Sequence, residues 1–209
     1  MLNHERRAWA EGHRCLVGID EAGRGPLAGP VVAGAVYMSA SFLETENLGV
    51  LVGLTDSKKL TVFQRNCFFA LFQDRPEIAF AAGSASVEEV DEFNVLRATH
   101  LAMRRAVEAL PLTPDHLLVD GLPVNDLPIP ATAIVKGDAR SLLIAAASVV
   151  AKVTRDKMME KLSKEYPGYG LGRNKGYGTS EHIEAIRHHG PAACHRKTFS
   201  PIRQPHFDF

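Results

Sequence analysis

The sequence has few of the features that mark secreted, membrane-spanning or zinc-binding proteins. Its three cysteines, Cys15, Cys67 and Cys194, are scattered and odd in number, which argues against a disulfide framework and favours reduced, mostly packed thiols. No paired C-x-x-C accompanies Cys194 and its neighbouring histidines, so a zinc site is not expected. No apolar run is long enough to cross a bilayer, and the polar residues 1–14 do not resemble a signal peptide. We therefore expect a cytoplasmic protein.

The sequence also lacks a net charge, since 24 basic residues balance 24 acidic ones. The distribution is nevertheless uneven: residues 1–135 hold 11 basic and 17 acidic residues, whereas residues 136–209 hold 13 and 7. Such a chain can present a basic surface around an acidic pocket, although ordinary solvated charge explains the same numbers. Composition thus leaves nucleic-acid binding open. A length of 209 residues favours one main domain with an appendage.

No repeat, low-complexity run or flexible linker is present, and the apolar runs are typical of short strands. The strands are predicted at residues 15–19, 31–37, 78–84, 116–119 and 132–135. Ser86 and Glu89 form a capping-box pattern, which predicts a helix from there to about residue 110, with Asn94 as a candidate break.

The last third of the sequence is predicted to be mainly helical. Residues 141–164 have a helical pattern whose first half is apolar nearly all round, so that half should be buried. Residues 167–178 are rich in glycine, tyrosine and basic residues and are predicted to be loop. Thr179 or Ser180 then begins a final helix, which Gly190 ends. The order of elements indicates an α/β domain with a mixed sheet, followed by a mainly helical C-terminal piece.

Acidic residues follow three of the predicted strands. Asp20 and Glu21 end the first, Asp120 ends the fourth, and Asp138 comes shortly after the fifth. If these strands are parallel neighbours, their carboxyl ends share one sheet edge, and carboxylates crowded there would need a divalent cation. Two metals held in this way could hydrolyse a phosphodiester. Each acid alone is explained as well by turn chemistry, but three strands ending alike favour a metal site.

Two qualifications apply to this hypothesis. Successive strand residues point to opposite faces, so Asp20 and Glu21 can share a metal only if the strand ends there. Gly23-x-Gly25 also resembles a dinucleotide-binding turn, but a strand-like run follows it instead of the helix that would bind a pyrophosphate. We therefore reject the dinucleotide interpretation.

Several blocks of the sequence together resemble the ribonuclease HII family of bacterial type. They occur in the family's order and span roughly residues 12–203: IDEAGRGPLAGPV (19–31), DSKKL (56–60), VDG (119–121), KGD (136–138), AAAS (145–148), NKGYGT (174–179) and His195-Arg196. The resemblance implies an α/β, RNase H-like fold, with a five-stranded mixed sheet flanked by helices and a C-terminal helical segment. It implies three parts: a lead-in (1–14), a catalytic domain (15–165) and a C-terminal substrate-binding loop and helical segment (166–209).

The resemblance also implies the residues of the site. The family's four catalytic, metal-binding acids correspond to Asp20, Glu21, Asp120 and Asp138. Its substrate-binding residues correspond to Gly23, Arg24 and Gly25, whose main chain approaches the ribose 2′-hydroxyl, to Tyr177, which senses the substrate, and to Ser57 and Lys58, which hold a phosphate of the DNA strand. The implied cofactor is a pair of Mg²⁺ or Mn²⁺ ions. Oxygen ligands alone do not discriminate between these two metals.

The resemblance implies an endonuclease that acts on RNA–DNA hybrids and on ribonucleotides embedded in duplex DNA. It would cut on the 5′ side of the ribonucleotide and leave 3′-hydroxyl and 5′-phosphate ends. We expect a monomer that does not associate with a membrane. Two alternatives are ribonuclease HIII, whose extra N-terminal domain has no counterpart in residues 1–14, and a nucleic-acid-binding protein that has lost catalysis. Among the remaining candidates, Asp156 is expected to pair with Lys152, and His182, His188 and His189 to be packed or solvated.

Overall fold

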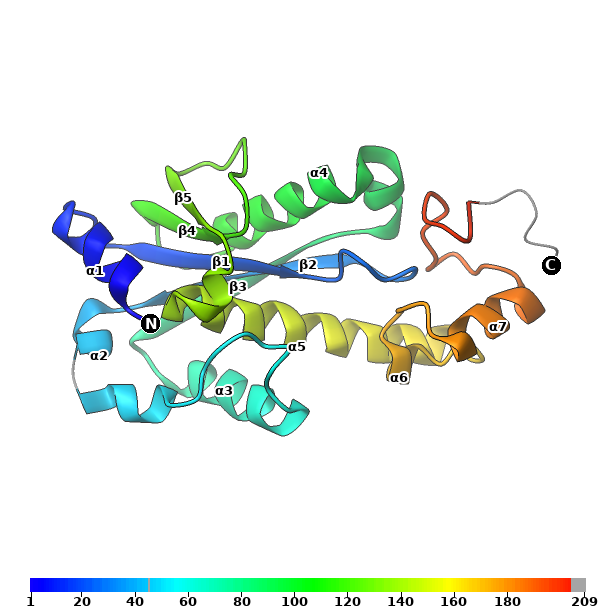
Figure 1. Ribbon diagram of the computed structural model, residues 1–209, viewed down its shortest axis with the longest axis horizontal. Helices are drawn as coiled ribbons and strands as arrows, with labels where there is room; N and C mark the ends of the chain where they lie inside the picture. Colours follow the sequence, from blue (N-terminus) through cyan, green and yellow to red (C-terminus); the bar gives the residue numbers. More distant parts are fainter. Residues whose placement is uncertain (45, 204–209) are drawn as a thin grey trace.

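A computed structural model of the chain describes residues 1–44 and 46–203 and contains one five-stranded sheet (Figure 1). The strand order is β3-β2-β1-β4-β5. β1 pairs antiparallel with β2, as does β2 with β3, whereas β1 and β4, and β4 and β5, pair in parallel. The strands are β1 (Leu16–Ala22), β2 (Val31–Met38), β3 (Ile78–Ala85), β4 (His116–Asp120) and β5 (Ala131–Ile134). The predicted mixed sheet, with its three parallel neighbours, is confirmed.

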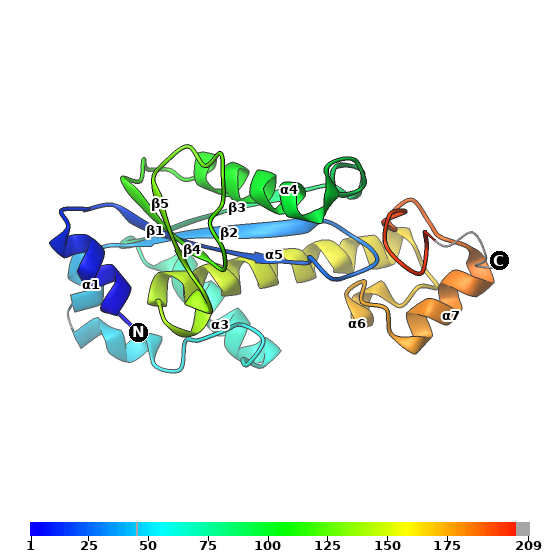
Figure 2. The ribbon, with the colours of Figure 1, turned by 45° about the horizontal axis from the view of Figure 1, so that its top comes forward.

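Helices cover both faces of this sheet. α4 packs on one face and α5, with α3 beside it, on the other, while α6 and α7 lie beyond the end of the sheet with the C-terminal segment (Figures 1 and 2). No helix in the described ranges has both the length and the apolar character that crossing a bilayer requires. The helices are α1 (Asn3–Ala10), α2 (Ala40–Glu44), α3 (Val62–Asp74), α4 (Val87–Glu108), α5 (Leu142–Glu165), α6 (Leu171–Asn174) and α7 (Ser180–His189), with 3-10 turns η1 (Glu46–Leu51) and η2 (Gly137–Ala139).

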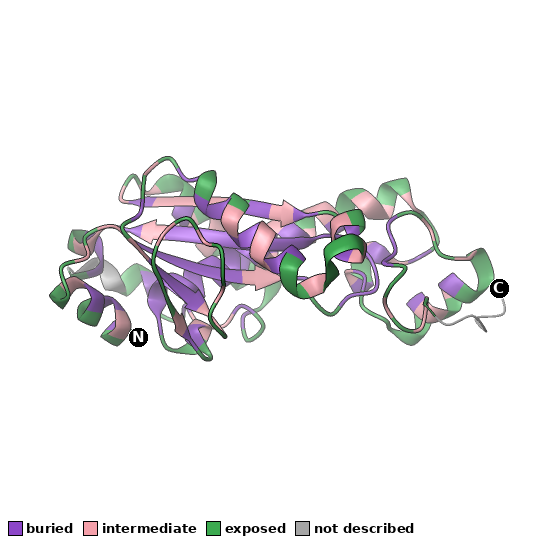
Figure 3. Cartoon of the chain, turned by 90° about the horizontal axis from the view of Figure 1, so that it is seen from above, coloured by how far each residue is buried: buried purple, intermediate pink, exposed green. Residues whose placement is uncertain are grey.

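The alternation of side chains along the strands divides the interior into two cores. Along β1, Leu16 belongs to the core on the α5 side, and Val17 and Ile19 belong to the core on the α4 side. Gly18 lies under α5, where an added Cβ would come within 2.2 Å of the Leu143 carbonyl carbon. Glycine at this position therefore allows α5 to approach the sheet closely, and the central strands are buried on both faces (Figure 3).

Several local predictions are confirmed, and one is wrong in part. Ser86 and Glu89 form the expected capping box at the start of α4, and Asn94 interrupts that helix with φ 69°. Residues 167–178 are not all loop, because they contain α6. Left-handed Gly170 and Lys175 bound this single turn, which is too short to carry a periodic pattern. Helices α1, α2 and α3 were not predicted. Residues 204–209 of the predicted C-terminal segment lie outside the described residues.

The stretch 1–14 is an integral part of the main domain. The side chain of Glu5 in α1 is fully buried, and its Oε1 accepts hydrogen bonds from Ser141 Oγ at 2.7 Å and from the Leu142 and Leu143 N–H groups at 2.8 and 3.1 Å. A carboxylate in this position satisfies free N–H groups at the start of α5, and its negative charge interacts favourably with the positive end of the helix dipole. Helix α1 therefore anchors α5 next to η2, which carries Asp138.

Candidate active site

The register of the parallel strands brings two of the predicted acids together. Ile19 of β1 is paired with Val119 of β4, so Asp20 and Asp120 come next on adjacent strands and share the α5 face of the sheet. Asp138 follows β5 in η2. One carboxylate oxygen from each of Asp20, Asp120 and Asp138 lies within 4.8 Å of the other two. The sheet edge thus gathers three of the four predicted acids.

Main-chain N–H groups orient two of these carboxylates. The N–H of Glu21 donates to Asp20 Oδ1 at 2.7 Å, and the N–H of Gly137 donates to Asp120 Oδ1 at 2.6 Å. A Cβ at residue 137 would lie 2.5 Å from Ile144 Cδ1, so glycine there allows η2 to pack against β4 and α5. Strand β1 and the turn η2 thus hold the carboxylates of Asp20 and Asp120 in place through these N–H groups.

Burial and neighbouring carboxylates disfavour the ionised forms of Asp20 and Asp138. Burial raises the pKa of Asp20 well above its usual range, and the charges of Glu21, Asp120 and Asp138 raise it further. Burial and the charge of Asp120 also raise the pKa of Asp138. A divalent cation relieves both effects, and ligands that are all carboxylate oxygens suit Mg²⁺ or Mn²⁺. The residues present therefore fit the implied metal.

Glu21 does not belong to this three-acid group. Strand β1 continues through Ala22, so the alternation of side chains turns Glu21 away from the face that carries Asp20. Its Oε1 instead accepts a hydrogen bond from Arg24 Nη1 at 3.1 Å. Glu21 still lines the cavity described next, and its role as a metal ligand stays a prediction.

A cavity of about 310 Å³ opens beside Asp20 and unites segments that are distant in sequence. All six residues that the resemblance assigned to substrate binding line it. The full lining consists of Asp20, Glu21, Ala22, Gly23, Arg24, Gly25, Ser57, Lys58, Lys152, Arg155 and Tyr177. The turn after β1, the segment before α3 and the loop before α7 thus meet next to the acids.

The turn after β1 depends on a buried arginine that the sequence analysis did not single out. Gly23 has φ +97°, and an added Cβ would lie 2.1 Å from Arg155 Nε. Arg155 donates to the carbonyls of Ala28, Pro30 and Lys175 at 3.1, 3.0 and 2.9 Å. The sequence did contain a signal, because Arg155 follows Ala147 and Ala151 at i+4 spacing on the buried face of α5.

Buried polar groups hold the segment that carries Ser57 and Lys58. The N–H of Ser57 donates to Ser148 Oγ at 3.2 Å, and Arg65 Nη1 donates to the carbonyls of Ser57 and Leu60 at 2.7 and 2.6 Å. Lys58 is exposed at the rim of the cavity. The sequence analysis missed both Ser148 and Arg65 as supports of this segment.

The secondary candidates have the expected surroundings. Lys152 Nζ donates to Asp156 Oδ1 at 2.7 Å, which confirms the predicted pair. His182 is fully buried, and His188 and His189 are exposed. Cys15, Cys67 and Cys194 are free thiols, but Cys67 is exposed rather than packed.

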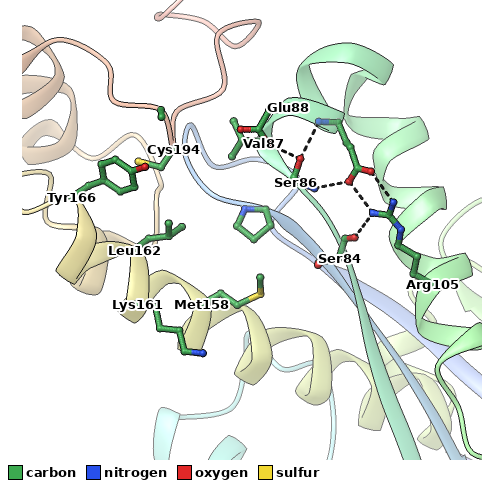
Figure 4. A pocket seen from close by; sticks show the side chains of 13 residues that line it. Ser84, Ser86, Val87, Glu88, Arg105, Met158, Lys161, Leu162, Tyr166 and Cys194 are labelled. Carbon is green, nitrogen blue, oxygen red and sulfur yellow. Dashed lines mark hydrogen bonds and ion pairs between the residues drawn. The ribbon is translucent and has the colours of Figure 1, made fainter.

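A second cavity, of about 500 Å³, lies between the start of α4 and α5 (Figure 4). Its carboxylates are already engaged: Glu89 forms two hydrogen bonds with Arg105, at 2.7 and 2.8 Å, and Glu88 accepts from Ser86 Oγ at 2.6 Å. Cys194 lies at its edge, where burial raises the pKa of the thiol to about 11 and makes it a poor nucleophile. The carboxylates and the thiol of this cavity are therefore not available as metal ligands or nucleophiles in the way that the three acids are.

Comparisons with known proteins point to one family. The sequence profile of the family described as Ribonuclease HII matches residues 17–202. Ribonuclease HII of Desulfitobacterium hafniense is 48% identical over 204 residues, which cover 98% of this chain and 75% of that protein.

Solved structures have the same fold. Ribonuclease H2 of Pyrococcus horikoshii OT3 superposes with a TM-score of 0.75 and 27% identity, over 93% of this chain and 97% of that one. Bst-RNase HIII in complex with Mn²⁺ superposes with a TM-score of 0.62 and 18% identity, over 91% of this chain and 68% of that one, a likeness of fold alone. Because the HII profile spans most of the sequence and a relative is 48% identical across nearly all of it, the chain belongs to the ribonuclease HII family and is an endonuclease of the ribonuclease H class.

Proposed function

We propose that this chain is a metal-dependent endonuclease that hydrolyses the RNA strand of RNA–DNA hybrids and cuts on the 5′ side of ribonucleotides embedded in duplex DNA. The observation that carries the proposal is the three-acid group of Asp20, Asp120 and Asp138 beside a cavity lined by a glycine turn, a tyrosine and basic side chains. Binding of nucleic acid alone does not require three carboxylates clustered beside the cavity, whereas metal-dependent catalysis does.

The acids have the first role in this scheme. Asp20, Asp120 and Asp138 would hold the divalent cations, and Glu21 would join them by giving up its contact with Arg24. When bound, these cations would supply Lewis-acid catalysis for attack of water on the phosphorus. The bond that breaks joins phosphorus to the 3′-oxygen of the preceding nucleotide, which leaves a 3′-hydroxyl and a 5′-phosphate. Bst-RNase HIII, which has the same fold, has been solved in complex with Mn²⁺, and this supports a divalent cation as the cofactor.

The glycine turn and Tyr177 would recognise the ribonucleotide. Only the 2′-hydroxyl distinguishes ribose from deoxyribose at a single position. Gly25 lies open to the cavity, since the nearest atom to an added Cβ there is Tyr177 Cε1, at 3.9 Å. The main chain of the turn and the half-exposed ring of Tyr177 therefore lie side by side on the cavity wall, where both can contact one sugar. Arg24 and Lys58, exposed at the rim, are suited to phosphates on either side.

The test is a cleavage assay on a DNA duplex with one embedded ribonucleotide, run with Mg²⁺, with Mn²⁺ and with chelator. We expect one cut on the 5′ side of the ribonucleotide in either metal and none in chelator. An all-DNA duplex of the same sequence is the matched control and should stay intact. Equal cleavage in chelator, or cleavage of the all-DNA control, would refute the proposal.

A further inference from the structure

The C-terminal segment returns from α7 to the main domain and inserts a buried arginine beneath the glycine turn. Arg196 is fully buried. Its Nη2 donates to the carbonyls of Gly23 and Gly29 at 2.6 and 2.8 Å, its Nη1 to that of Arg24 at 3.0 Å, and its Nε to that of Gly29 at 3.0 Å. One rigid guanidinium thus connects the two ends of the turn, and all of these acceptors are main-chain carbonyls of that turn.

Main-chain pairing joins the same two segments. The N–H of Arg196 donates to the carbonyl of Leu27 at 2.8 Å, and the N–H of Gly29 donates to that of Cys194 at 2.9 Å. Ala28 and His195 form an isolated antiparallel bridge. The position of the turn is therefore tied to that of residues 194–196, although more than 160 positions separate them in sequence.

His195 connects this segment to the loop of Tyr177 through a second buried histidine. Nε2 of His195 lies 3.0 Å from Nε2 of His182, and Nδ1 of His182 lies 2.9 Å from the carbonyl oxygen of Tyr177. Both histidines are fully buried. The N–H of Ala192 donates to Nδ1 of His195 at 3.0 Å.

These contacts allow one self-consistent set of protons for a neutral pair. The Tyr177 carbonyl only accepts, so Nδ1 of His182 carries a proton and its Nε2 is an acceptor. Nε2 of His195 must then donate to it, so Nδ1 of His195 accepts from the Ala192 N–H at 3.0 Å and does not donate to the Ala192 carbonyl, 3.2 Å away. The hydrogen bonds therefore run in one direction, from Ala192 through His195 and His182 to Tyr177.

We propose that the dipeptide His195-Arg196 is a positioning element that sets the glycine turn and Tyr177 in register with each other. Arg196 acts on the turn directly, and His195 acts on Tyr177 through His182. The inference rests on the proposed function, in which the turn and the tyrosine contact the same ribonucleotide. Neither His195 nor Arg196 lines the cavity, so both act through the residues that do.

Two substitutions of His195 separate this role from general packing. Glutamine places an N–H near the position of Nε2 and can still donate to His182. Asparagine keeps an oxygen near the position of Nδ1 for the Ala192 N–H but cannot reach His182. In single-turnover cleavage of a duplex with one ribonucleotide, we expect His195→Asn to be slowed by about 10-fold or more, and His195→Gln to stay within about threefold of the parent.

The decisive measurement repeats both variants in a Tyr177→Ala background. If His195 acts through Tyr177, the difference in rate between His195→Asn and His195→Gln should nearly vanish there, because the ring to be positioned is gone. Arg196→Lys, which keeps the charge but cannot span three carbonyls, should likewise cost less in that background. Thermal melts and Mn²⁺ binding are measured on every variant, and both should be similar for the two His195 substitutions.

The outcomes distinguish this inference from the proposed function. Equal rates for His195→Asn and His195→Gln, or a difference that persists in full with Tyr177→Ala, would overturn the positioning role and leave the proposed function standing. Full activity of Tyr177→Ala alone would overturn the inference and the recognition role of Tyr177, while the metal-dependent cleavage of the proposed function would still stand. If His195→Asn does not fold, His182→Gln replaces it, since glutamine there can accept from His195 but cannot donate to the Tyr177 carbonyl. His182→Gln with parental rates would overturn the inference.

Discussion

Gly25 faces the ring of Tyr177 across the cavity, with 3.9 Å between an added Cβ and Tyr177 Cε1. That distance is an ordinary van der Waals contact, and the φ of Gly25 is not in the left-handed region. Gly25→Ala should therefore fold normally yet fill the space that a sugar would need. We predict a melting temperature within about 2 °C of the parent and a loss of cleavage on the order of 10-fold or more.

Gly23→Ala is the matched control for this substitution. Gly23 has φ +97°, and its added Cβ would collide with Arg155 Nε, so alanine there should lower stability as well as activity. Thermal melts and single-turnover cleavage rates of both variants show whether each substitution acts on stability, on cleavage or on both. A stable Gly25→Ala enzyme with undiminished cleavage would show that the space opposite Tyr177 is not used by substrate.

The acid cluster predicts opposite effects on stability and on activity. Asp20→Asn removes a buried charge that Glu21, Asp120 and Asp138 oppose, so the metal-free variant should melt at a higher temperature than the metal-free parent. The same change removes a metal ligand, and we expect cleavage to fall on the order of 10³-fold or more. Divalent metal should raise the melting temperature of the parent much more than that of the variant. Near-parental turnover in Mg²⁺ would show that Asp20 is not a ligand.

Lys58 predicts a change in salt dependence. It is exposed at the rim of the cavity, on a segment that Arg65 and Ser148 hold in place. If Lys58 contacts a phosphate, Lys58→Ala should weaken binding and reduce the slope of log affinity against log salt by about one unit. Lys59→Ala, an exposed neighbour that does not line the cavity, is the control. An identical slope for parent and Lys58→Ala would remove Lys58 from the phosphate contacts.

Tyr177 predicts a difference between two substitutions. Tyr177→Ala should sharply reduce cleavage at a single embedded ribonucleotide while fold and metal binding persist, because the side chain is 46% exposed and little packing is lost. Tyr177→Phe keeps the ring and should be less damaging. Single-turnover rates are compared with thermal melts of the same preparations. A melting temperature that falls in step with activity would indicate a packing role instead.

The buried histidine pair predicts a pH dependence of stability. Burial, with the charge of His182, lowers the pKa of His195 to about 4, from an ordinary value of 6.5. Between these values the unfolded chain binds the proton and the folded chain does not, so stability is lost as the pH falls from 6.5 towards 4. His195→Gln lacks this proton uptake. From pH 7 to pH 5 the parent should lose on the order of 2 kcal/mol more than the variant in urea unfolding. Equal losses would contradict the neutral buried pair.

Much of the main domain was predictable because its signals are local. The capping box at Ser86 and Glu89, the break at Asn94 and the apolar first half of α5 depend on neighbouring residues, and each appears where it was predicted. The clustering of the acids at three strand ends could also be predicted from the sequence, once the strands were assumed to be parallel neighbours. Helix α3 was missed because its apolar residues do not follow a clear helical period, and α2, with five residues, is too short to have one.

The sequence by itself determined that carboxylates end three strands, that a glycine turn follows the first, and that the family is ribonuclease HII. The tertiary structure decided which of these residues meet. Glu21 stands apart from the other acids because β1 continues past it and alternation turns it towards Arg24. The structure also decided what Arg155 and Arg196 do, because the carbonyls that they bind include ones more than 100 positions away in sequence. Hydrogen bonds to main-chain carbonyls do not require particular side chains in the partner, so the sequence alone does not reveal which carbonyls these two arginines bind.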